Sequence, residues 1–368
     1  MKRGRRLVLL LVAAAAAGAC KGPTPTLQGA FDGISESVSS LLGAKSLPGK
    51  YVQEIYAVHE DDKTWRFKAD VTDALGQCCE SIRGLGAADY ASWRETAIVV
   101  NLLVVMSDEH PSALVRAESL DTLPRMFSWT SAAVSPTERR TTDDEMNQAL
   151  DRIVAARKAP KDDPGVAADL ADALNVVAAY RFDQARGLPE KIDVRRLARD
   201  ARGQLKTTGR TLRQLTGGAL GTGDADPRVR DALDRALVGT SASAIRLALV
   251  SAATGAANDT VRTAAVRDLE QARPDQAGRI LGAVLQSDDS SSVRREAARA
   301  LGSFPEAEAV PPLLAALSDD RFEVRATASA SLAAVTGQTL GDDRRAWLRW
   351  WQSRSGGSPA PGDVQGPR

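Results

Sequence analysis

The hydrophobic positions between residues 224 and 334 recur with a period of 31 or 32 residues. A valine followed directly by an arginine occurs four times, at Val229, Val261, Val293 and Val324. A leucine or alanine stands four residues after each valine, and a leucine stands eight residues after it. Because positions i, i+4 and i+8 lie along one side of an α-helix, each copy predicts an amphipathic helix with one apolar stripe.

The residues around each stripe predict a second helix and a turn. An acidic side chain stands before each valine, where it can cap the free amides of the first turn. These residues are Asp226, Asp259, Asp289 and Asp320. A further apolar segment precedes three of the stripes, at residues 242–252, 277–285 and 309–317. A unit of two short helices cannot bury both apolar faces alone, so we expect an all-α, right-handed solenoid of stacked helical hairpins.

The segment from Glu308 to Leu332, which reads EAVPPLLAALSDDRFEVRATASASL, resembles the HEAT-repeat family, in particular its bacterial HEAT-like members. In that family the second helix opens with an aspartate followed by valine and arginine, and these charged residues form a ladder between neighbouring repeats. The resemblance implies such a ladder here, with varying spacing between its members. Its residues are Asp226, Arg230, Asp259, Arg262, Asp289, Arg294, Asp320 and Arg325.

Less regular copies occur upstream. Val115 and Arg116 are followed by Ser119 and Leu123 at the i+4 and i+8 positions, which predicts a fifth copy. Val194 and Arg195 repeat the start of the pattern, but position 202 is an arginine. Between them we expect exposed loops at residues 128–143 and 158–164 and helices at 144–156 and 166–181. This insertion either bulges from the solenoid or divides it into two arms.

The far end of the repeats carries an aromatic cluster. Trp347, Trp350 and Trp351 have the i, i+3, i+4 spacing that gathers side chains on one face of a helix. The last repeat of a solenoid has a bare apolar face, so we interpret this helix as a cap. The segment resembles the tail of many bacterial HEAT-repeat proteins. A partner-binding hot spot is the alternative for the same tryptophans.

The first 26 residues predict export and anchorage. Residues 1–19 combine a basic start with an apolar run too short to span a bilayer, as in a secretory signal. The next residue, Cys20, follows Ala-Gly-Ala, which resembles the lipobox of bacterial lipoproteins, in which the cysteine is acylated. That resemblance implies a lipid anchor in the cell envelope, and Lys21 suggests the outer membrane. The alternative is an ordinary signal peptide with an accidental cysteine.

These features divide the chain into seven parts. They are a signal peptide (1–19), a lipidated tether (20–26), degenerate N-terminal repeats (27–127), a helical insertion (128–205), C-terminal repeats (206–335), a capping helix (336–353) and a disordered tail (354–368).

Composition and charge exclude some partners. Hydrophobic residues make up 43% of the chain but aromatic residues only 4%, so the helices are lined mainly by small and aliphatic side chains. The formal charge is +1, and loss of the four basic residues in the signal would change it to −3. This balance gives no basic patch for nucleic acid, so we expect no nucleic-acid partner.

No catalytic or metal-binding pattern is present in the sequence. The two histidines, His59 and His110, are far apart, and zinc needs three or four ligands together. Neighbouring Cys78 and Cys79 diverge on a helix, which favours two buried thiols over a disulfide. We therefore expect no catalytic residue, metal or cofactor.

These features favour a non-enzymatic scaffold that binds an unknown protein or peptide on its concave face. The candidate contacts are Arg228, Arg235, Arg267, Arg295 and Arg299. Some HEAT-like proteins are lyases or parts of enzyme complexes, so one alternative is an enzyme or accessory with a pocket formed by the 128–205 insertion. A structural spacer in the envelope is a third possibility.

Overall fold

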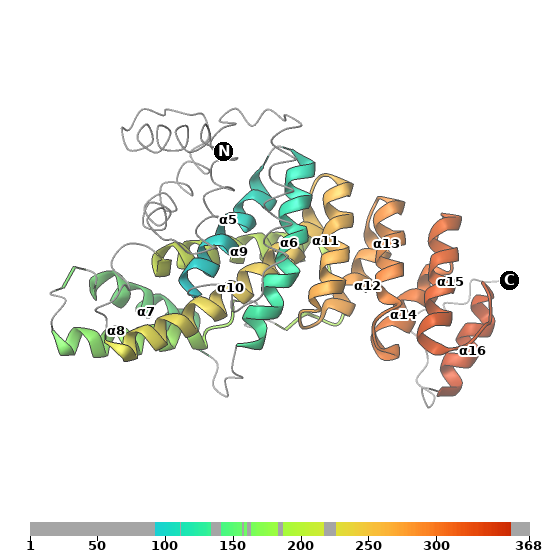
Figure 1. The fold of residues 1–368 in the computed structure, drawn as a ribbon. Helices are drawn as coiled ribbons and strands as arrows, with labels where there is room; N and C mark the ends of the chain where they lie inside the picture. The colour runs from blue at the N-terminus through green and yellow to red at the C-terminus, as the bar shows by residue number, and fades with distance from the viewer. Residues whose placement is uncertain are drawn as a thin grey trace, which may run out of the picture. The chain divides into compact units, whose positions relative to one another are not determined.

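The computed structural model describes residues 93–110, 112–133, 141–156, 158–159, 163–182, 187–216 and 226–354. Every regular element in these ranges is an α-helix, and the helices are labelled α5 to α16 in Figure 1. The expected signal at 1–19, Cys20, the Cys78–Cys79 pair, His59 and the tail from residue 355 lie outside the described residues.

The chain divides into two compact units. Unit 1 comprises residues 1–187 and 197–252, and unit 2 comprises residues 188–196 and 253–368. Unit 1 contains two helical hairpins, in which α5 packs on α6 and α7 packs on α8. The helices of this part of the chain are α5 (Trp93–Glu109), α6 (Ala113–Ala132), α7 (Asp143–Ala156), α8 (Pro164–Ala179), α9 (Val194–Thr216) and α10 (Pro227–Gly255).

Local signals start the helices of the second hairpin. The Thr142 hydroxyl accepts from the Glu145 amide and Glu145 accepts from the Thr142 amide, which together form a capping box at the start of α7. Asp163 caps α8, where the Gly165 amide donates to its carboxylate (2.8 Å) and Pro164 occupies the first turn.

The helix α10 corrects one expectation. The stripe that begins at Val229 and the apolar segment at 242–252 were expected to be separate helices, but both belong to this single 29-residue helix. The sequence between them contains no proline, and the Thr240 hydroxyl donates to the Ala236 carbonyl (2.7 Å) inside the continuous helix. The first copy is therefore not a hairpin.

α10 is also long and apolar enough to cross a bilayer by length and composition alone. However, 89% of its most apolar 18-residue window is buried inside the protein. A core helix meets the same criteria, and this degree of burial agrees with that role.

Two expected boundaries also differ from the structure. The loop expected at 128–143 begins later, because α6 continues through residues 128–132. The limit drawn between residues 205 and 206 falls inside α9.

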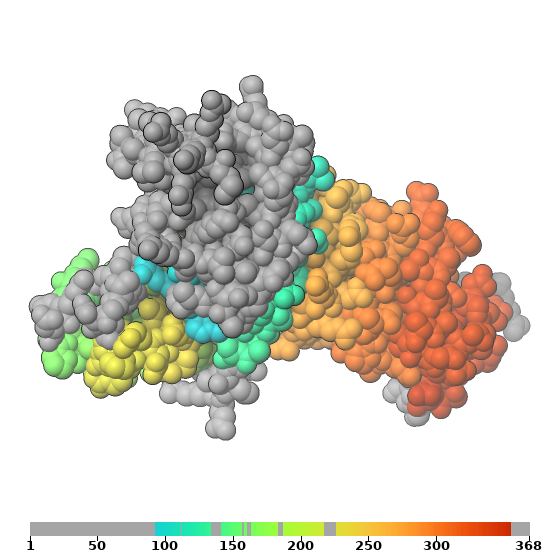
Figure 2. All heavy atoms as spheres, in the orientation of Figure 1, coloured from blue at the N-terminus to red at the C-terminus, as the bar shows by residue number. Residues whose placement is uncertain are grey.

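Unit 2 contains the regular repeats. Figure 1 shows its helices alternating between two rows, with α11, α13 and α15 in one row and α12, α14 and α16 in the other. Figure 2 shows the atoms of α11 to α15 packed side by side. The helices are α11 (Asp259–Ala272), α12 (Ala277–Ser287), α13 (Ser291–Leu301), α14 (Glu306–Ala316), α15 (Phe322–Thr336) and α16 (Arg344–Arg354).

The predicted stripes form the core between these rows. The i, i+4 and i+8 residues of α11, α13 and α15 are all fully buried, which confirms the stripe in three copies. They are Val261, Ala265, Leu269, Val293, Ala297, Leu301, Val324, Ala328 and Leu332. Close stacking in the other row depends on small residues, since a Cβ added at Gly282 would lie 3.2 Å from the Pro312 ring. The expected all-α solenoid is confirmed.

Candidate functional site

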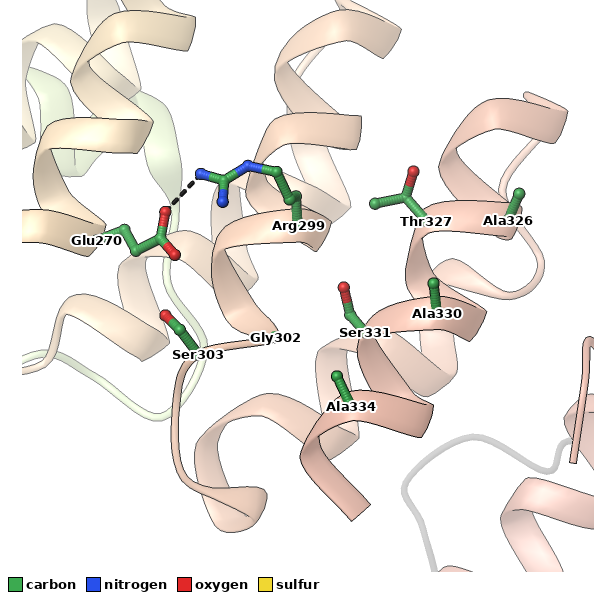
Figure 3. Close-up of a pocket in the computed structure, with 9 residues that line it drawn as sticks. All are labelled: Glu270, Arg299, Gly302, Ser303, Ala326, Thr327, Ala330, Ser331 and Ala334. Carbon is green, nitrogen blue, oxygen red and sulfur yellow. Dashed lines mark hydrogen bonds and ion pairs between the residues drawn. The ribbon is translucent and has the colours of Figure 1, made fainter. Parts of the chain in front are cut away.

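The candidate site is a groove on the row formed by α11, α13 and α15. It has a volume of about 600 Å³ and lies mainly between the end of α13 and the middle of α15, as Figure 3 shows. The lining residues are Glu270, Arg299, Gly302, Ser303, Ala326, Thr327, Ala330, Ser331 and Ala334. We call the outward side of these three helices the α11–α13–α15 face.

Small side chains form the α15 wall of the groove. Ala326, Ala330 and Ala334 follow the i, i+4, i+8 spacing on the exposed side of α15, opposite the buried stripe. Gly302 continues this lining at the end of α13, where an added Cβ would lie 3.0 Å from the Arg299 carbonyl oxygen. A wall without long side chains lets another polypeptide approach the backbone of α15 closely.

Ion pairs line the opposite side of the groove. The Arg299 guanidinium bridges Glu270 of α11 and Glu296 of its own helix, the latter at 3.0 Å. Arg267 also contacts Glu296, at 3.5 Å. Burial lowers the pKa of Arg299, but hydrogen bonds and charges from Glu270 and Glu296 outweigh it and leave the pKa raised. Arg299 is therefore charged at neutral pH and is already paired with the two glutamates.

The structure separates the five candidate contact arginines. Arg228 and Arg235 belong to unit 1, where Arg228 pairs with Asp226 (2.7 Å) and Arg235 donates to the Asn175 side chain (2.9 Å). The other three belong to the α11–α13–α15 face of unit 2. Of these, Arg267 and Arg299 are paired, whereas Arg295 is exposed and has no hydrogen bond or ion pair with the described residues.

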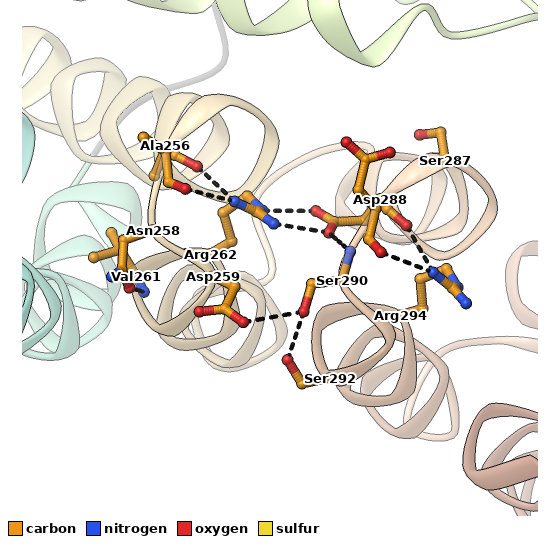
Figure 4. Close-up of polar contacts among 12 residues, drawn as sticks. Ala256, Asn258, Asp259, Val261, Arg262, Ser287, Asp288, Ser290, Ser292 and Arg294 are labelled. Atoms are coloured by element: carbon orange, nitrogen blue, oxygen red, sulfur yellow. Dashed lines mark hydrogen bonds and ion pairs between the residues drawn. The ribbon is translucent and has the colours of Figure 1, made fainter. Parts of the chain in front are cut away.

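A ladder of arginines and aspartates joins successive repeats along the turns that precede α11, α13 and α15. Figure 4 shows the first of these pairs, between Arg262 and Asp288. Arg262 donates from Nε and Nη2 to the two carboxylate oxygens of Asp288, at 2.8 and 3.0 Å. Arg294 donates in the same way to Asp319, at 2.8 and 2.9 Å. These paired bonds are the strong, bidentate form of an ion pair.

The aspartates of the ladder differ from those expected. Asp288 and Asp319 receive the arginine forks, and each stands one residue before the expected Asp289 and Asp320. Asp320 adds a second contact to Arg294 Nη2 (2.7 Å), but its side chain is 74% exposed. Both turns read Asp-Asp, so the sequence offered no means of choosing between the neighbours.

Of the four expected aspartate caps, the one at Asp226 is confirmed and the other three are corrected. Asp226 caps α10 by accepting from the Arg228 amide (2.9 Å). At α11 the cap is Asn258, and Asp259 instead accepts from the Ser290 hydroxyl (3.1 Å). Asp288 and Asp319 accept from the amides two residues later, so each supports its own turn while binding the arginine of the preceding repeat.

Each ladder arginine also holds its own turn. Nη1 of Arg262, Arg294 and Arg325 donates to the carbonyl oxygen six residues earlier, at 2.8, 3.0 and 2.8 Å. In unit 1, Arg116 donates to the carbonyl of His110, also six residues earlier. The fifth copy expected at Val115 therefore shares this contact, with His110 in the place of the ladder aspartate and its Nδ1 accepting from the Ser112 amide (3.0 Å).

The three tryptophans of α16 have different surroundings. Trp347 is fully buried, and its Nε1 donates to the Gly341 carbonyl (2.8 Å). Its ring lies edge-on to Trp350, with the ring centres 5.8 Å apart. Trp350 and Trp351 remain partly exposed, and Arg354 lies over the Trp350 ring. Burial of Trp347 in the helix that follows the last repeat fits a cap.

The ionisable groups of the groove are paired, and the described residues hold no cluster of metal-ligand type. In the described ranges, no three histidine, cysteine, aspartate or glutamate side chains gather in a way that could hold a metal ion. The ionisable residues that line the groove, Glu270 and Arg299, are hydrogen-bonded to each other.

Comparison with known families agrees with this architecture. Residues 246–333 match the family of HEAT repeats, and the match spans 88 of the 368 residues. A search of curated proteins found no match to the chain. Stacked repeats of this type present extended surfaces that bind other proteins. The coarse role supported by the match is therefore a protein-interaction scaffold.

Proposed function

We propose that this chain is a non-enzymatic scaffold, anchored by lipid at Cys20 on the outer side of a bacterial membrane, that binds a protein or peptide on its α11–α13–α15 face. The observation that carries the binding proposal is the groove of about 600 Å³ on that face. Pockets and grooves with a few well-placed polar groups are the usual places where ligands bind.

The lining of the groove suggests what kind of segment fits. The alanines of α15 offer an apolar surface without long side chains, so a helix or extended segment can lie close to it. Arg295, one turn before Arg299 on α13, is exposed and free to pair. We therefore expect the bound segment to place an apolar side chain on the alanines and an acidic side chain near Arg295.

The binding proposal can be tested by filling the groove. Photocrosslinking from Thr327 in the producing cells would first identify the partner. Ala330→Arg then places a long charged side chain in the groove. Because this side chain would occupy the space of the bound segment, we expect recovery of the crosslinked partner to fall at least about tenfold, which corresponds to about 1.4 kcal/mol.

Ala315→Arg is the matched control, because Ala315 is an exposed alanine on α14 in the other row. This variant should bind like the original protein, and the two variants should have equal thermal stability. Equal partner recovery with both arginine variants would overturn the groove as the binding site.

The anchorage proposal rests on the signal-like segment and the lipobox-like residues before Cys20. More than one acyl chain gives stable membrane attachment, whereas one chain binds only marginally. With Cys20→Ser, we expect loss of fatty-acid labelling and movement of the protein out of the membrane fraction. Ser39→Ala, a similar small change further along the chain, should leave fractionation unchanged. Membrane attachment of Cys20→Ser without the label would refute the anchor.

A further inference from the structure

The pairs Arg262–Asp288 and Arg294–Asp319 are the two complete rungs of the ladder, and both have the same geometry. In each rung, arginine Nη1 holds the carbonyls of its own turn, while Nε and Nη2 form a two-donor fork toward the next turn. The fork binds the aspartate found 26 residues after Arg262 and 25 residues after Arg294. The pairs are largely shielded, since the arginine side chains are 15% and 12% exposed.

Within the described ranges, the third fork of the ladder has no carboxylate partner. Arg325 anchors Nη1 on the carbonyls of Asp319 and Asp320, at 2.8 and 3.2 Å, as the other two arginines do. No acceptor in the part of the chain that the structure describes contacts its Nε or Nη2. The residues 25 and 26 positions later are Trp350 and Trp351, whose indole groups donate hydrogen bonds and cannot replace a carboxylate.

An exposed aromatic ring lies beside this fork. Phe322 is 68% exposed, which is unusual for a phenylalanine, and the Arg325 guanidinium carbon lies 5.9 Å from its ring centre. The anchoring of Nη1 limits the freedom of the guanidinium, so less entropy is lost when a ligand binds. A planar fork with fixed orientation selects an anion with two oxygens.

We propose that Arg325 and Phe322 form a second binding site, which takes the carboxylate of an aspartate or glutamate in a partner polypeptide, with an apolar residue of that partner beside Phe322. A carboxylate is chosen because the same fork binds aspartate in both complete rungs. The site continues the ladder into a partner molecule and does not depend on occupancy of the groove.

A peptide copied from residues 286–292, which contains Asp288 as presented to Arg262, is a suitable probe. Nitrogen-15 NMR of the full chain can follow each arginine Nε–H signal, with Arg325→Lys identifying the signal of Arg325. We expect a saturable shift of the Arg325 signal on titration, while the signals of Arg262 and Arg294 stay in place because their forks are filled. A peptide with asparagine at both aspartates should give no saturable shift.

Two further experiments test whether Phe322 takes part and whether the carboxylate comes from a partner or from the chain itself. Replacing Ser290 of the peptide with leucine should tighten binding to the original protein, and Phe322→Ala should abolish that gain. An unchanged gain would remove Phe322 from the site. Absence of a saturable shift with the aspartate peptide would overturn the proposal. A second result would also overturn it. Without peptide, the Arg325 signal would already lie at its peptide-bound position, and it would move away in Asp363→Asn, a change in the segment after residue 354, because the chain would then fill its own fork.

Discussion

The helices of unit 1 and the repeats of unit 2 use the same kinds of packing but connect their parts differently. In unit 1, α6 keeps the buried stripe at Val115 and the arginine contact to the carbonyl six residues earlier, yet His110 stands where the ladder needs an aspartate. In unit 2, Arg262 and Arg294 each reach the following repeat. In both units the arginine supports its own turn, and it links two repeats only where an aspartate stands one repeat later.

We expect the largest effect from truncating the buried stripes, and the test asks whether they contribute equally to the stability of both units. Leu301→Ala in α13 and Leu123→Ala in α6 remove equivalent, fully buried side chains. Each should reduce the free energy of unfolding by about 2–5 kcal/mol, from lost burial and the cavity left behind. Hydrogen exchange should show each loss concentrated in the unit that carries the change. Equal loss of protection throughout both units would show that they unfold as one.

The two aspartates of the turn before α15 should contribute unequally to stability. Asp319→Asn breaks the bidentate pair with Arg294, and we expect a loss of about 1.5–3 kcal/mol in the free energy of unfolding. Asp320→Asn is the matched control, since its exposed side chain should contribute less than about 1 kcal/mol. Denaturant titration of both variants gives the measurement. A larger loss with Asp320→Asn would reassign the rung to the residue expected from the sequence.

The ladder also predicts a pH dependence. Burial raises the pKa of Asp319, but hydrogen bonds from Arg294 and the Arg321 amide outweigh it, so the pKa lies below its usual range. A carboxyl group whose pKa is lower in the folded state stabilises the fold above its unfolded pKa of about 4, and this contribution is lost as the pH falls through the folded value.

The original protein should therefore lose more unfolding free energy between pH 7 and about pH 3 than Asp319→Asn does. Urea midpoints for both proteins at the two pH values provide the comparison. Identical pH dependence would mean that Asp319 contributes little to the coupling of repeats.

We expect the smallest loss of stability from removing helix caps, and this loss should be similar in the two units. Asn258→Ala removes the cap of α11, and Thr142→Ala removes one half of the capping box of α7. Each should cost about 1 kcal/mol or somewhat less, because one or two amides lose their acceptor. Denaturation midpoints and local hydrogen exchange at the first turn would measure it. A cost confined to α11 would indicate that capping matters only within the stacked repeats.

The sequence predicted the features that depend on spacing alone. The valine, alanine and leucine positions of α11, α13 and α15 were assigned to the buried stripe, because helical periodicity fixes which residues share a face. Other features depend on which of two neighbouring residues makes a contact, and the spacing of the sequence does not determine that choice. Asp288 and Asp289 are chemically identical, and only the path of the turn decides which one faces Arg262. Likewise, nothing in the sequence marks the continuation of α10 past Val238.

The candidate site was predicted only in part. The row of helices that carries Arg299 could be inferred from the repeat, whereas the groove depends on the exposed alanines of α15, which a sequence pattern assigns equally well to a core. The open fork of Arg325 was hidden for another reason. Its existence follows from the absence of an acceptor among the described residues, and that absence becomes visible only when the geometry of the preceding rungs is known.

We propose above that the α11–α13–α15 face is the surface on which a protein partner binds. Hydrogen exchange of the chain, alone and in complex with the partner recovered by crosslinking, tests it most directly. We predict increased protection in α13 and α15 along the groove, with α12 and α14 unchanged. Protection confined to α12 and α14, or to the helices of unit 1, would contradict the claim.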